Sequence, residues 1–344
     1  MNGRKARIAF IGCGGHATRS LYPCIHEIPI VDLVAVCDLK EELARRNARL
    51  FGARRWYTDM FEMLEKEKPD GVLVIGDPHM QFEVGSKVLE AGYPIFVEKP
   101  SAIDSNKARQ LAELADSKGL FGQVAFMKRF AYAYQIAKKL VESEEFGGVH
   151  LIDVKFSQGP YPRIWGLESA SKSFLIGQAI HLFDLVRFFG GDVEKVHAFY
   201  TEISPEQFGY TVNLRFKSGA IGLMNLNSMD MREPWRDFDE RLNVSGDRNM
   251  VEVRDMIYLR YQSREDWVEP PEGTGKPKLI WEPTGPALPS RGKILGYTGE
   301  IEHFARCLLE GRKPSPDLWD SYEALRLAEA VWESVQTGKI VEIR

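Results

Sequence analysis

Short, nearly continuous apolar runs recur along the first third of the chain, and segments with the spacing of amphipathic helices separate them. Strands buried on both faces of a parallel sheet have this unbroken apolar character, whereas helices repeat their apolar residues every three to four positions. The predicted strands are 7–11, 33–37, 72–75, 95–97 and 120–126, and the predicted helices are 41–51, 60–67, 82–91 and 107–118. This alternation predicts a right-handed, doubly wound parallel sheet.

The pattern changes after residue 124, where apolar runs separated by turn signals replace the alternation of strands and helices. One helix is expected at 176–189, and two amphipathic helices, 297–309 and 322–337, close the chain. Segment 270–292 is rich in proline and glycine and is predicted as a surface loop. The expected strands of an open, mostly antiparallel sheet are 149–157, 193–203, 210–216, 220–226, 241–245 and 250–254.

The length of 344 residues exceeds what one ordinary core supports, so we expect two domains. We place the first domain at 1–124 and a second, α/β domain at 125–344, whose last helices can pack back on the first. The composition, with 44% hydrophobic and 27% charged residues, is that of a globular protein.

The net charge of -4, without any long run of lysine or arginine, gives no basic field that would attract a phosphate backbone. We therefore expect no nucleic-acid partner. No stretch approaches the roughly 18 apolar residues of a membrane span, and the apolar run within 1–10 is too short for a signal peptide. The four cysteines have no metal-type spacing, so we expect reduced thiols, no metal site and a cytoplasmic location.

The first apolar run leads into Gly12-x-Gly14-x-x-Ala17. In such a turn the first glycine permits a tight bend, the second lets a pyrophosphate approach the backbone, and the small third residue lets the next helix pack closely on the strand. The N-terminus of that helix offers free N–H groups to an anion. We therefore expect a dinucleotide to bind here, at Gly12, Gly14, Gly15 and His16.

The second predicted strand ends in Asp38, which lies 21 positions after Ala17 (38 minus 17). An acidic residue at this place can accept hydrogen bonds from the adenosine ribose, and its charge would repel a 2'-phosphate. The sequence thus favours NAD over NADP as cofactor. Asp38 could also cap the following helix, and the two roles are compatible.

The strand at 95–97 runs directly into Glu98-Lys99-Pro100. Ligands of open α/β sheets bind beyond the carboxyl ends of the strands, which places Glu98 and Lys99 at the mouth of such a crevice. A lysine there suits chemistry because its pKa moves readily on partial burial. Asp77-Pro78 follows the neighbouring strand and is a further candidate for the cofactor site. The alternative is that Glu98 and Lys99 form an ordinary solvated strand end.

The helix at 176–189 holds His181 and Asp184 among apolar residues. They are three positions apart and so share a helical face. A single histidine on a largely apolar helix is more often a core residue than a catalyst. Both interpretations stay open on these residues alone.

Together these motifs resemble the Gfo/Idh/MocA oxidoreductases, the family of glucose-fructose oxidoreductase and inositol dehydrogenase. The resemblance spans nearly the whole chain, and Glu98-Lys99-Pro100 is its most specific part; it also includes the closing segments 297–304 and 324–330. It implies a Rossmann domain joined to an α/β domain whose open sheet forms dimers or tetramers. It also implies hydride transfer between nicotinamide and a secondary alcohol of a sugar, inositol or related polyol.

The resemblance assigns roles to individual residues. Lys99 would hydrogen-bond the reacting oxygen and His181 would exchange its proton, while Glu98 and Lys99 would also contact the cofactor. Segment 159–166 has aromatic and cationic groups that could bind a sugar, although an ordinary aromatic loop would look the same. The candidate substrate-binding residues are Lys128, Arg129, Tyr161, Arg163, Trp165 and Asp184.

Two departures from the family pattern bear on the reaction. The family usually has an aspartate four residues before the histidine, where this chain has Gly177, and often a later histidine after the strand-four proline, where it has Phe82. The missing carboxylate favours an alternative, an NAD-binding sensor without turnover. Another alternative is a glycoside-cleaving enzyme that oxidises its substrate transiently. Retention of Lys99 and His181 favours a dehydrogenase.

Overall fold

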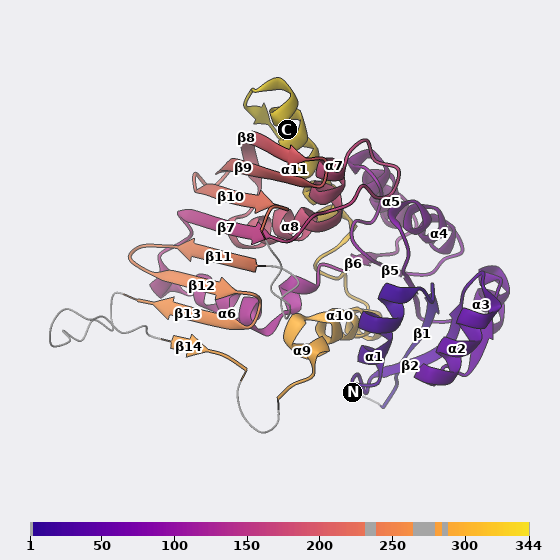
Figure 1. Ribbon diagram of the computed structural model, residues 1–344. Coiled ribbons are helices and arrows are strands. Elements are labelled where there is room, and N and C mark those ends of the chain that lie inside the picture. The colour runs from indigo at the N-terminus through magenta and orange to yellow at the C-terminus, as the bar shows by residue number, and fades with distance from the viewer. Residues whose placement is uncertain (1–2, 231–238, 264–278, 284–287, 344) are drawn as a thin grey trace. The chain divides into compact units, whose positions relative to one another are not determined.

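The computed structural model of the protein describes residues 3–230, 239–263, 279–283 and 288–343. They form two compact units (Figure 1). The first comprises the chain up to Met127 together with Gly296–Leu325, and the second comprises Lys128–Leu295 together with Arg326–Arg344. No helix in these described ranges is long and apolar enough to cross a membrane.

The first unit contains a six-stranded sheet in the order β3-β2-β1-β4-β5-β6, with every neighbouring pair parallel. Its strands are β1 (Ala6–Ile11), β2 (Val31–Cys37), β3 (Arg55–Tyr57), β4 (Gly71–Val74), β5 (Ile95–Val97) and β6 (Gly122–Val124). The doubly wound parallel sheet is thus confirmed. The strand order reverses between β1 and β4, which is where ligands of such sheets bind.

The predicted helices of this unit are present, with boundaries that differ by a few residues. They are α2 (Glu41–Phe51), α3 (Met60–Glu67), α4 (Pro78–Glu90) and α5 (Ser105–Ser117), and a π-helical turn η1 (Ala17–Leu21) with α1 (Tyr22–Ile25) follows β1. The edge strand β3 was not predicted. Arg55 and Trp56 in it are exposed, so it has no apolar run to mark it.

Helix α10 (Tyr297–Glu310) packs on this parallel sheet although about 200 residues separate it from β5. Phe304 lies in the same buried cluster as Phe10 and Phe96, and the Phe96 and Phe304 rings are 5.8 Å apart between centroids. The amide of Gln123 in β6 donates to the Glu300 carbonyl at 2.8 Å. The helix therefore belongs to the core of the Rossmann unit.

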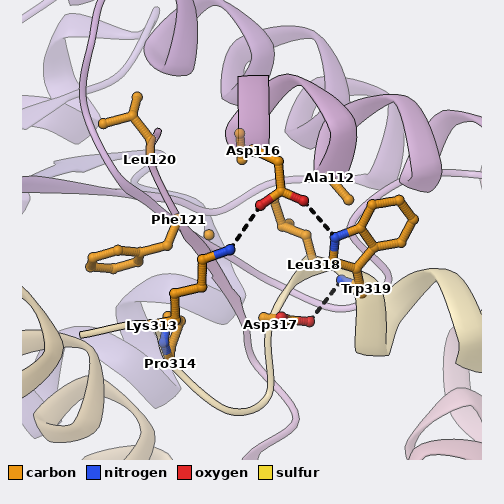
Figure 2. Close-up of a pocket in the computed structure, with 11 residues that line it drawn as sticks. Ala112, Asp116, Leu120, Phe121, Lys313, Pro314, Asp317, Leu318 and Trp319 are labelled. Atoms are coloured by element: carbon orange, nitrogen blue, oxygen red, sulfur yellow. Dashed lines mark hydrogen bonds and ion pairs between the residues drawn. The ribbon is translucent and has the colours of Figure 1, made fainter. Parts of the chain in front are cut away.

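The segment after α10 is anchored to α5 through Asp116, as Figure 2 shows. The Asp116 carboxylate accepts hydrogen bonds from Trp319 Nε1 at 2.9 Å and Lys313 Nζ at 3.0 Å. The bond from Trp319, and then that from Lys313, lowers the pKa of Asp116. The adjoining hollow measures only about 20 Å³, room for about one water, so we regard it as an anchor and not as a ligand site.

The second unit contains a nine-stranded sheet in the order β14-β13-β12-β11-β7-β10-β9-β8-β15 (Figure 1). Among its described pairings, β10 and β7 are parallel and the others are antiparallel. The strands are β7 (Leu151–Ser157), β8 (Val193–Ser204), β9 (Gln207–Phe216), β10 (Ile221–Asn227), β11 (Asp239–Ser245), β12 (Met250–Arg254), β13 (Tyr258–Gln262), β14 (Leu279–Trp281) and β15 (Val341–Glu342). The open, mostly antiparallel sheet is confirmed.

Three strands of this sheet, β13, β14 and β15, were not predicted. Two of them have three residues or fewer, too few for a periodic pattern to appear. The predicted loop 270–292 lies partly outside the described residues. The prediction of one continuous loop was wrong, because β14 lies within this segment and α9 (Arg291–Leu295) begins near its end.

The helical run that carries His181 is longer than predicted. It begins with α7 (Ala170–Phe174), continues through a π-helical turn η4 (Leu175–Ala179) and ends as α8 (Ile180–Gly190). The Ser169 side chain caps its start by accepting from the Lys172 N–H at 3.0 Å. The other helices described in this unit are η2 (Met127–Phe130), α6 (Tyr132–Val141), η3 (Glu144–Phe146), α9 (Arg291–Leu295) and part of α11 (Leu318–Thr337).

Candidate active site

The first glycine of the turn after β1 is required by its packing. Gly12 has φ of 102°, and a Cβ on it would lie 2.0 Å from the Ile75 carbonyl oxygen, so only glycine fits where this turn passes the end of β4. A Cβ on Gly14 would meet nothing within 4 Å, and near Gly15 it would meet only the Arg19 side chain. The turn is thus packed on the sheet side at Gly12 and open at Gly14.

Asp38 lies directly beside this turn. Its Oδ2 accepts from the Cys13 N–H at 2.7 Å, and its Oδ1 accepts from the Lys40 N–H at 2.9 Å. The carboxylate that was predicted to bind a ribose therefore also holds the middle of the glycine turn. The alternative role as helix cap is wrong, because the N-cap of α2 is Lys40.

Glu98 joins the end of β5 to the glycine turn. Its Oε1 lies 2.8 Å from His16 Nε2, and its Oε2 accepts from the Lys99 N–H at 3.0 Å. Burial of Glu98 opposes ionisation, but His16 and then Lys99 outweigh it and lower the carboxyl pKa. The charge of Glu98 in turn raises the pKa of His16. Two motifs 82 residues apart thus form one charged contact.

Lys99 is half-buried at the end of β5, and the backbone after it is held from two sides. Pro100, which follows a cis peptide bond, accepts on its carbonyl from Gln81 Nε2 at 3.2 Å. The hydroxyls of Ser101 and Ser321 are 2.8 Å apart. Helix α4 and the start of α11 therefore fix the position of the lysine backbone.

Asp77 and Pro78 occupy the start of α4 at the carboxyl end of β4. The Asp77 carboxylate accepts from the N–H groups of His79 at 2.9 Å and Met80 at 3.0 Å, and Pro78 is the first helical residue. β4 pairs with β1, so this helix start belongs to the same sheet edge as the glycine turn. Asp77 is exposed, which leaves its outer face accessible.

Glu300 of α10 is a buried acid that the sequence did not single out. It is 0% exposed, and neither carboxyl oxygen has a hydrogen-bond partner among the described residues. Burial, and then the charge of Glu98, raises its pKa well above the usual range, while Lys99 lowers it in part. Glu98 and Glu300 therefore carry one negative charge between them. The sequence did contain a signal for this residue. Glu300 directly precedes Ile301 and lies four positions before Phe304, so it falls on the apolar side of the helix.

Replacing Glu300 by glutamine should make the stability of the protein less dependent on pH. Below the ordinary carboxyl pKa both states of the wild type are protonated. As pH rises above it, the unfolded chain ionises while folded Glu300 keeps its proton, which disfavours folding by up to about 1.4 kcal/mol per pH unit. Melting curves should therefore show an advantage of Glu300→Gln that grows from pH 5 to pH 8.

Glu302→Gln is the matched control for this measurement. Glu302 lies on the same helix but is partly exposed and paired with Arg306 at 2.5 Å. Its removal should not give an advantage that increases with pH. A constant difference between Glu300→Gln and the wild type over this range would contradict a protonated Glu300.

Arg129 and Asp184, two predicted substrate-binding residues, form a buried ion pair in the second unit. Arg129 donates to both carboxylate oxygens, from Nε at 2.9 Å and from Nη2 at 2.5 Å. The two residues are 6% and 0% exposed, and the guanidinium lies 5.2 Å from the centroid of the Phe188 ring. The pair fixes η2 to α8, the helix that carries His181.

Lys128 also forms a buried ion pair. Its ammonium bonds the Glu240 carboxylate, and the Tyr134 hydroxyl donates to Glu240 Oε1 at 2.5 Å. All three side chains are buried, and burial lowers the pKa of Lys128 against the opposing effect of Glu240. Sequence reasoning had no signal for Glu240, because 112 residues separate it from Lys128. A role of Lys128 in substrate binding stays a prediction.

The predicted sugar-binding segment packs against the helical run. A Cβ on Gly177 would lie 2.4 Å from the Tyr161 hydroxyl and 3.5 Å from Trp165 Cη2. Tyr161 and Trp165 are thus brought together one turn before His181. Arg163 is exposed and donates to the Leu167 carbonyl instead.

The described residues contain no group of three or more acidic, histidine or cysteine side chains that could hold a metal ion.

Comparison with known proteins agrees with this geometry. Residues 6–126 match the family model described as "Oxidoreductase family, NAD-binding Rossmann fold", and residues 138–343 match its C-terminal alpha/beta domain. The scyllo-inositol 2-dehydrogenase (NAD(+)) of Bacillus subtilis is 25% identical, covering 98% of this chain and 96% of its own. The D-apiose dehydrogenase of Paraburkholderia graminis is 24% identical, covering 98% and 89%.

A solved structure shares the fold over the whole chain. The levoglucosan dehydrogenase structure in complex with NADH and L-sorbose superposes with a TM-score of 0.85, covers 99% of both chains and is 19% identical. This likeness establishes the common fold.

Proposed function

Because the chain belongs to the Gfo/Idh/MocA oxidoreductase family, we propose that it is an NAD-dependent dehydrogenase acting on a secondary alcohol of a sugar, inositol or related polyol. The observation that carries this proposal is the contact between Glu98 and His16, which ties the glycine turn to the strand end that holds Lys99. The inositol- and apiose-oxidising relatives support the substrate class.

The residues at the sheet edge fit NAD. Gly14 leaves the backbone open to a pyrophosphate, and the helix that begins at Gly15 provides N–H groups. Asp38 would accept hydrogen bonds from the ribose hydroxyls, and Asp77 and Pro78 border the same edge. The raised pKa of His16 favours its positively charged form beside the turn. NAD, when bound, supplies the hydride acceptor or donor.

We assign the proton chemistry to two side chains. Lys99 would donate a hydrogen bond to the alcohol oxygen and stabilise the negative charge that develops on it. His181 would take or return the hydroxyl proton. Arg129 and Asp184 would act by fixing the helix of His181, since both are buried in their own ion pair.

A direct assay tests the function. The purified protein is incubated with NAD and a panel of inositols, aldoses and anhydrosugars while NADH is followed by absorbance, and we expect turnover of at least one neutral polyol. NAD binding without turnover of any compound would support the sensor alternative. Release of free sugar from a glycoside without NADH accumulation would support the glycoside-cleaving alternative.

We expect NAD to bind more tightly than NADP, and Asp38→Asn to weaken that preference roughly tenfold. The asparagine keeps an acceptor for the Cys13 N–H but removes the charge that would repel a 2'-phosphate. Tryptophan fluorescence titration with both cofactors measures the ratio. Asp32→Asn is the control, since Asp32 lies at the start of β2 and pairs with Arg54. An unchanged ratio in Asp38→Asn, or tighter NADP binding by the wild type, would refute the ribose assignment.

We further propose that the second unit forms a homodimer or homotetramer through the open face of its sheet. Neighbouring strands expose Leu151, Ile221 and Leu223, with Ile221 in register with Leu151, and β8 adds Phe199 and Ile203. Such apolar patches are usually covered by a partner.

The four cysteines are buried free thiols, which supports a cytoplasmic location.

Light scattering at micromolar concentration should give a mass of two or four times 39.1 kDa. Leu223→Asp should lower that mass, because a charge would be buried in the contact. Leu50→Asp, at an exposed leucine of α2 in the other unit, should not. A wild-type mass near 39.1 kDa would contradict the assembly.

A further inference from the structure

A hollow of about 760 Å³ lies in the Rossmann unit, between α2 and the edge strand β3. Small-molecule sites commonly have this size. Half of its ten lining residues are arginines, and a single acid, Glu42, lies among them. The chain as a whole carries a net charge of -4, so this cationic surface is a local feature. The five arginines are Arg45, Arg46, Arg49, Arg54 and Arg55.

Two of these arginines have no carboxylate partner. The other three pair with acids, with N–O distances of 3.7 Å from Arg45 to Glu41, 2.6 Å from Arg54 to Asp32 and 3.3 Å from Arg55 to Glu67. Among the described residues, no ion pair includes Arg46 or Arg49. These two are three positions apart on α2 and so share a face. An anion in the hollow would therefore meet positive charge that the protein itself does not neutralise.

Arg46 connects the hollow to the glycine turn. Its Nη2 donates to the Cys13 carbonyl at 3.1 Å and to Thr18 Oγ1 at 3.2 Å, and its Nε donates to Asn47 Oδ1 at 3.0 Å. A guanidinium has five N–H donors, and the bonds described for Arg46 use those of Nη2 and Nε. The two hydrogens on Nη1 are left for a ligand. Because one side chain both holds the turn and lines the hollow, an anion in the hollow should affect the cofactor site.

Trp56 adds a flat apolar surface to the hollow. Its side chain is 40% exposed, although tryptophan is highly buried on average. The Arg45 guanidinium lies 5.6 Å from the centroid of the indole ring. Indole rings and guanidinium planes both stack on planar ligands such as nucleotide bases. The hollow thus combines cations that suit phosphate groups with a surface that suits a base.

We propose that this hollow binds a polyphosphate anion, either inorganic or carried by a nucleoside, at a site separate from that of NAD. Guanidinium groups match phosphate oxygens with two parallel hydrogen bonds, and Arg46 and Arg49 supply them here. One segment, 42–56, provides the whole lining, which suits a small ligand better than a macromolecule. The site does not depend on the proposed dehydrogenase reaction.

Binding at this site weakens the binding of NAD without abolishing it. A second polyanion neutralises Arg46 and adds negative charge near the turn that receives the pyrophosphate of NAD. By linkage, NAD weakens the polyphosphate by the same factor. The effect therefore levels off as either ligand saturates, whereas two ligands that share one site displace each other completely.

Calorimetric titration of the NAD-saturated protein at low ionic strength tests the proposal, with tripolyphosphate, guanosine triphosphate and citrate as probes. We expect one tripolyphosphate per chain with a roughly micromolar dissociation constant, weaker binding as salt is added, and weaker binding of citrate. Tighter binding of guanosine triphosphate, lost in Trp56→Leu, would identify the nucleoside form of the ligand. Equal affinities of the two phosphates would identify the inorganic form.

Arg49→Gln should weaken tripolyphosphate binding roughly tenfold, because it removes one charge-assisted contact. Its melting temperature and NAD affinity should stay at the wild-type values, since the residue is exposed and does not contact the glycine turn. Arg109→Gln, at an exposed arginine of α5 that pairs with Glu113, is the control and should bind as the wild type does. Wild-type affinity of Arg49→Gln, tighter binding of citrate than of tripolyphosphate, no binding below millimolar concentration, or complete displacement by NAD would each overturn the proposal.

Discussion

Replacing Lys99 by alanine should reduce turnover more than replacing His181, by up to about 10⁴-fold against about 10²-fold for the histidine. Lys99 lies beside the buried carboxylate of Glu98, on a strand end fixed from two sides. We propose that its ammonium meets the developing alkoxide from this fixed strand end. His181 has Gly177 one turn before it, where the family usually has a carboxylate. Without that carboxylate we expect less stabilisation of a charged imidazole, so we expect Lys99 to carry the larger share.

The measurement is kcat with the best polyol found in the substrate panel. Lys99→Met separates the ammonium from the bulk of the side chain and should lose nearly as much activity as Lys99→Ala. Lys87→Ala, at an exposed position of α4 in the same unit, should retain wild-type turnover. NAD affinity serves as the folding control and should change little in all variants. Wild-type turnover of both Lys99→Ala and His181→Ala would rule out the assigned chemistry and favour the sensor alternative.

Replacing Arg129 by alanine should destabilise the second unit by about 3–5 kcal/mol, the usual result of removing one partner of a buried ion pair. The change takes from the Asp184 carboxylate two N–H donors, at 2.9 and 2.5 Å, and the positive charge that offsets its burial. Turnover should fall in parallel, because the pair fixes the helix that holds His181. Urea unfolding gives the stability, and NAD titration reports on the first unit separately.

The double variant Arg129→Met with Asp184→Leu distinguishes charge from packing. It removes both charges and should recover most of the lost stability, because well-packed apolar residues often replace a buried pair without cost. Arg45→Ala breaks the exposed pair with Glu41 and should cost less than about 1 kcal/mol. If Arg129→Ala kept its stability while KM rose sharply, Arg129 would be a direct substrate ligand, as the sequence analysis first assigned it.

Local signals explain how much of the fold could be predicted. Buried parallel strands are mostly apolar, so β1, β2, β4, β5 and β6 were visible as runs, and α3 was predicted with the observed bounds. The edge strands escaped because they are short or exposed, as β3 and β15 show. The π turn around Gly177 escaped too, since one extra residue within a helix leaves the apolar spacing nearly unchanged.

By itself, the sequence determined the glycine turn, Asp38 and the strand end with Glu98 and Lys99, because each depends on neighbours within a few positions. The tertiary structure decided what these residues touch. Only folding brings Glu98 to His16 across 82 residues, and only burial in that fold gives Glu300 its raised pKa. The structure also showed that Lys128 and Arg129 hold internal carboxylates, and that Tyr161 occupies the space at Gly177. The physical reason is that charge compensation and steric exclusion depend on distance in space, which separation along the chain does not reveal.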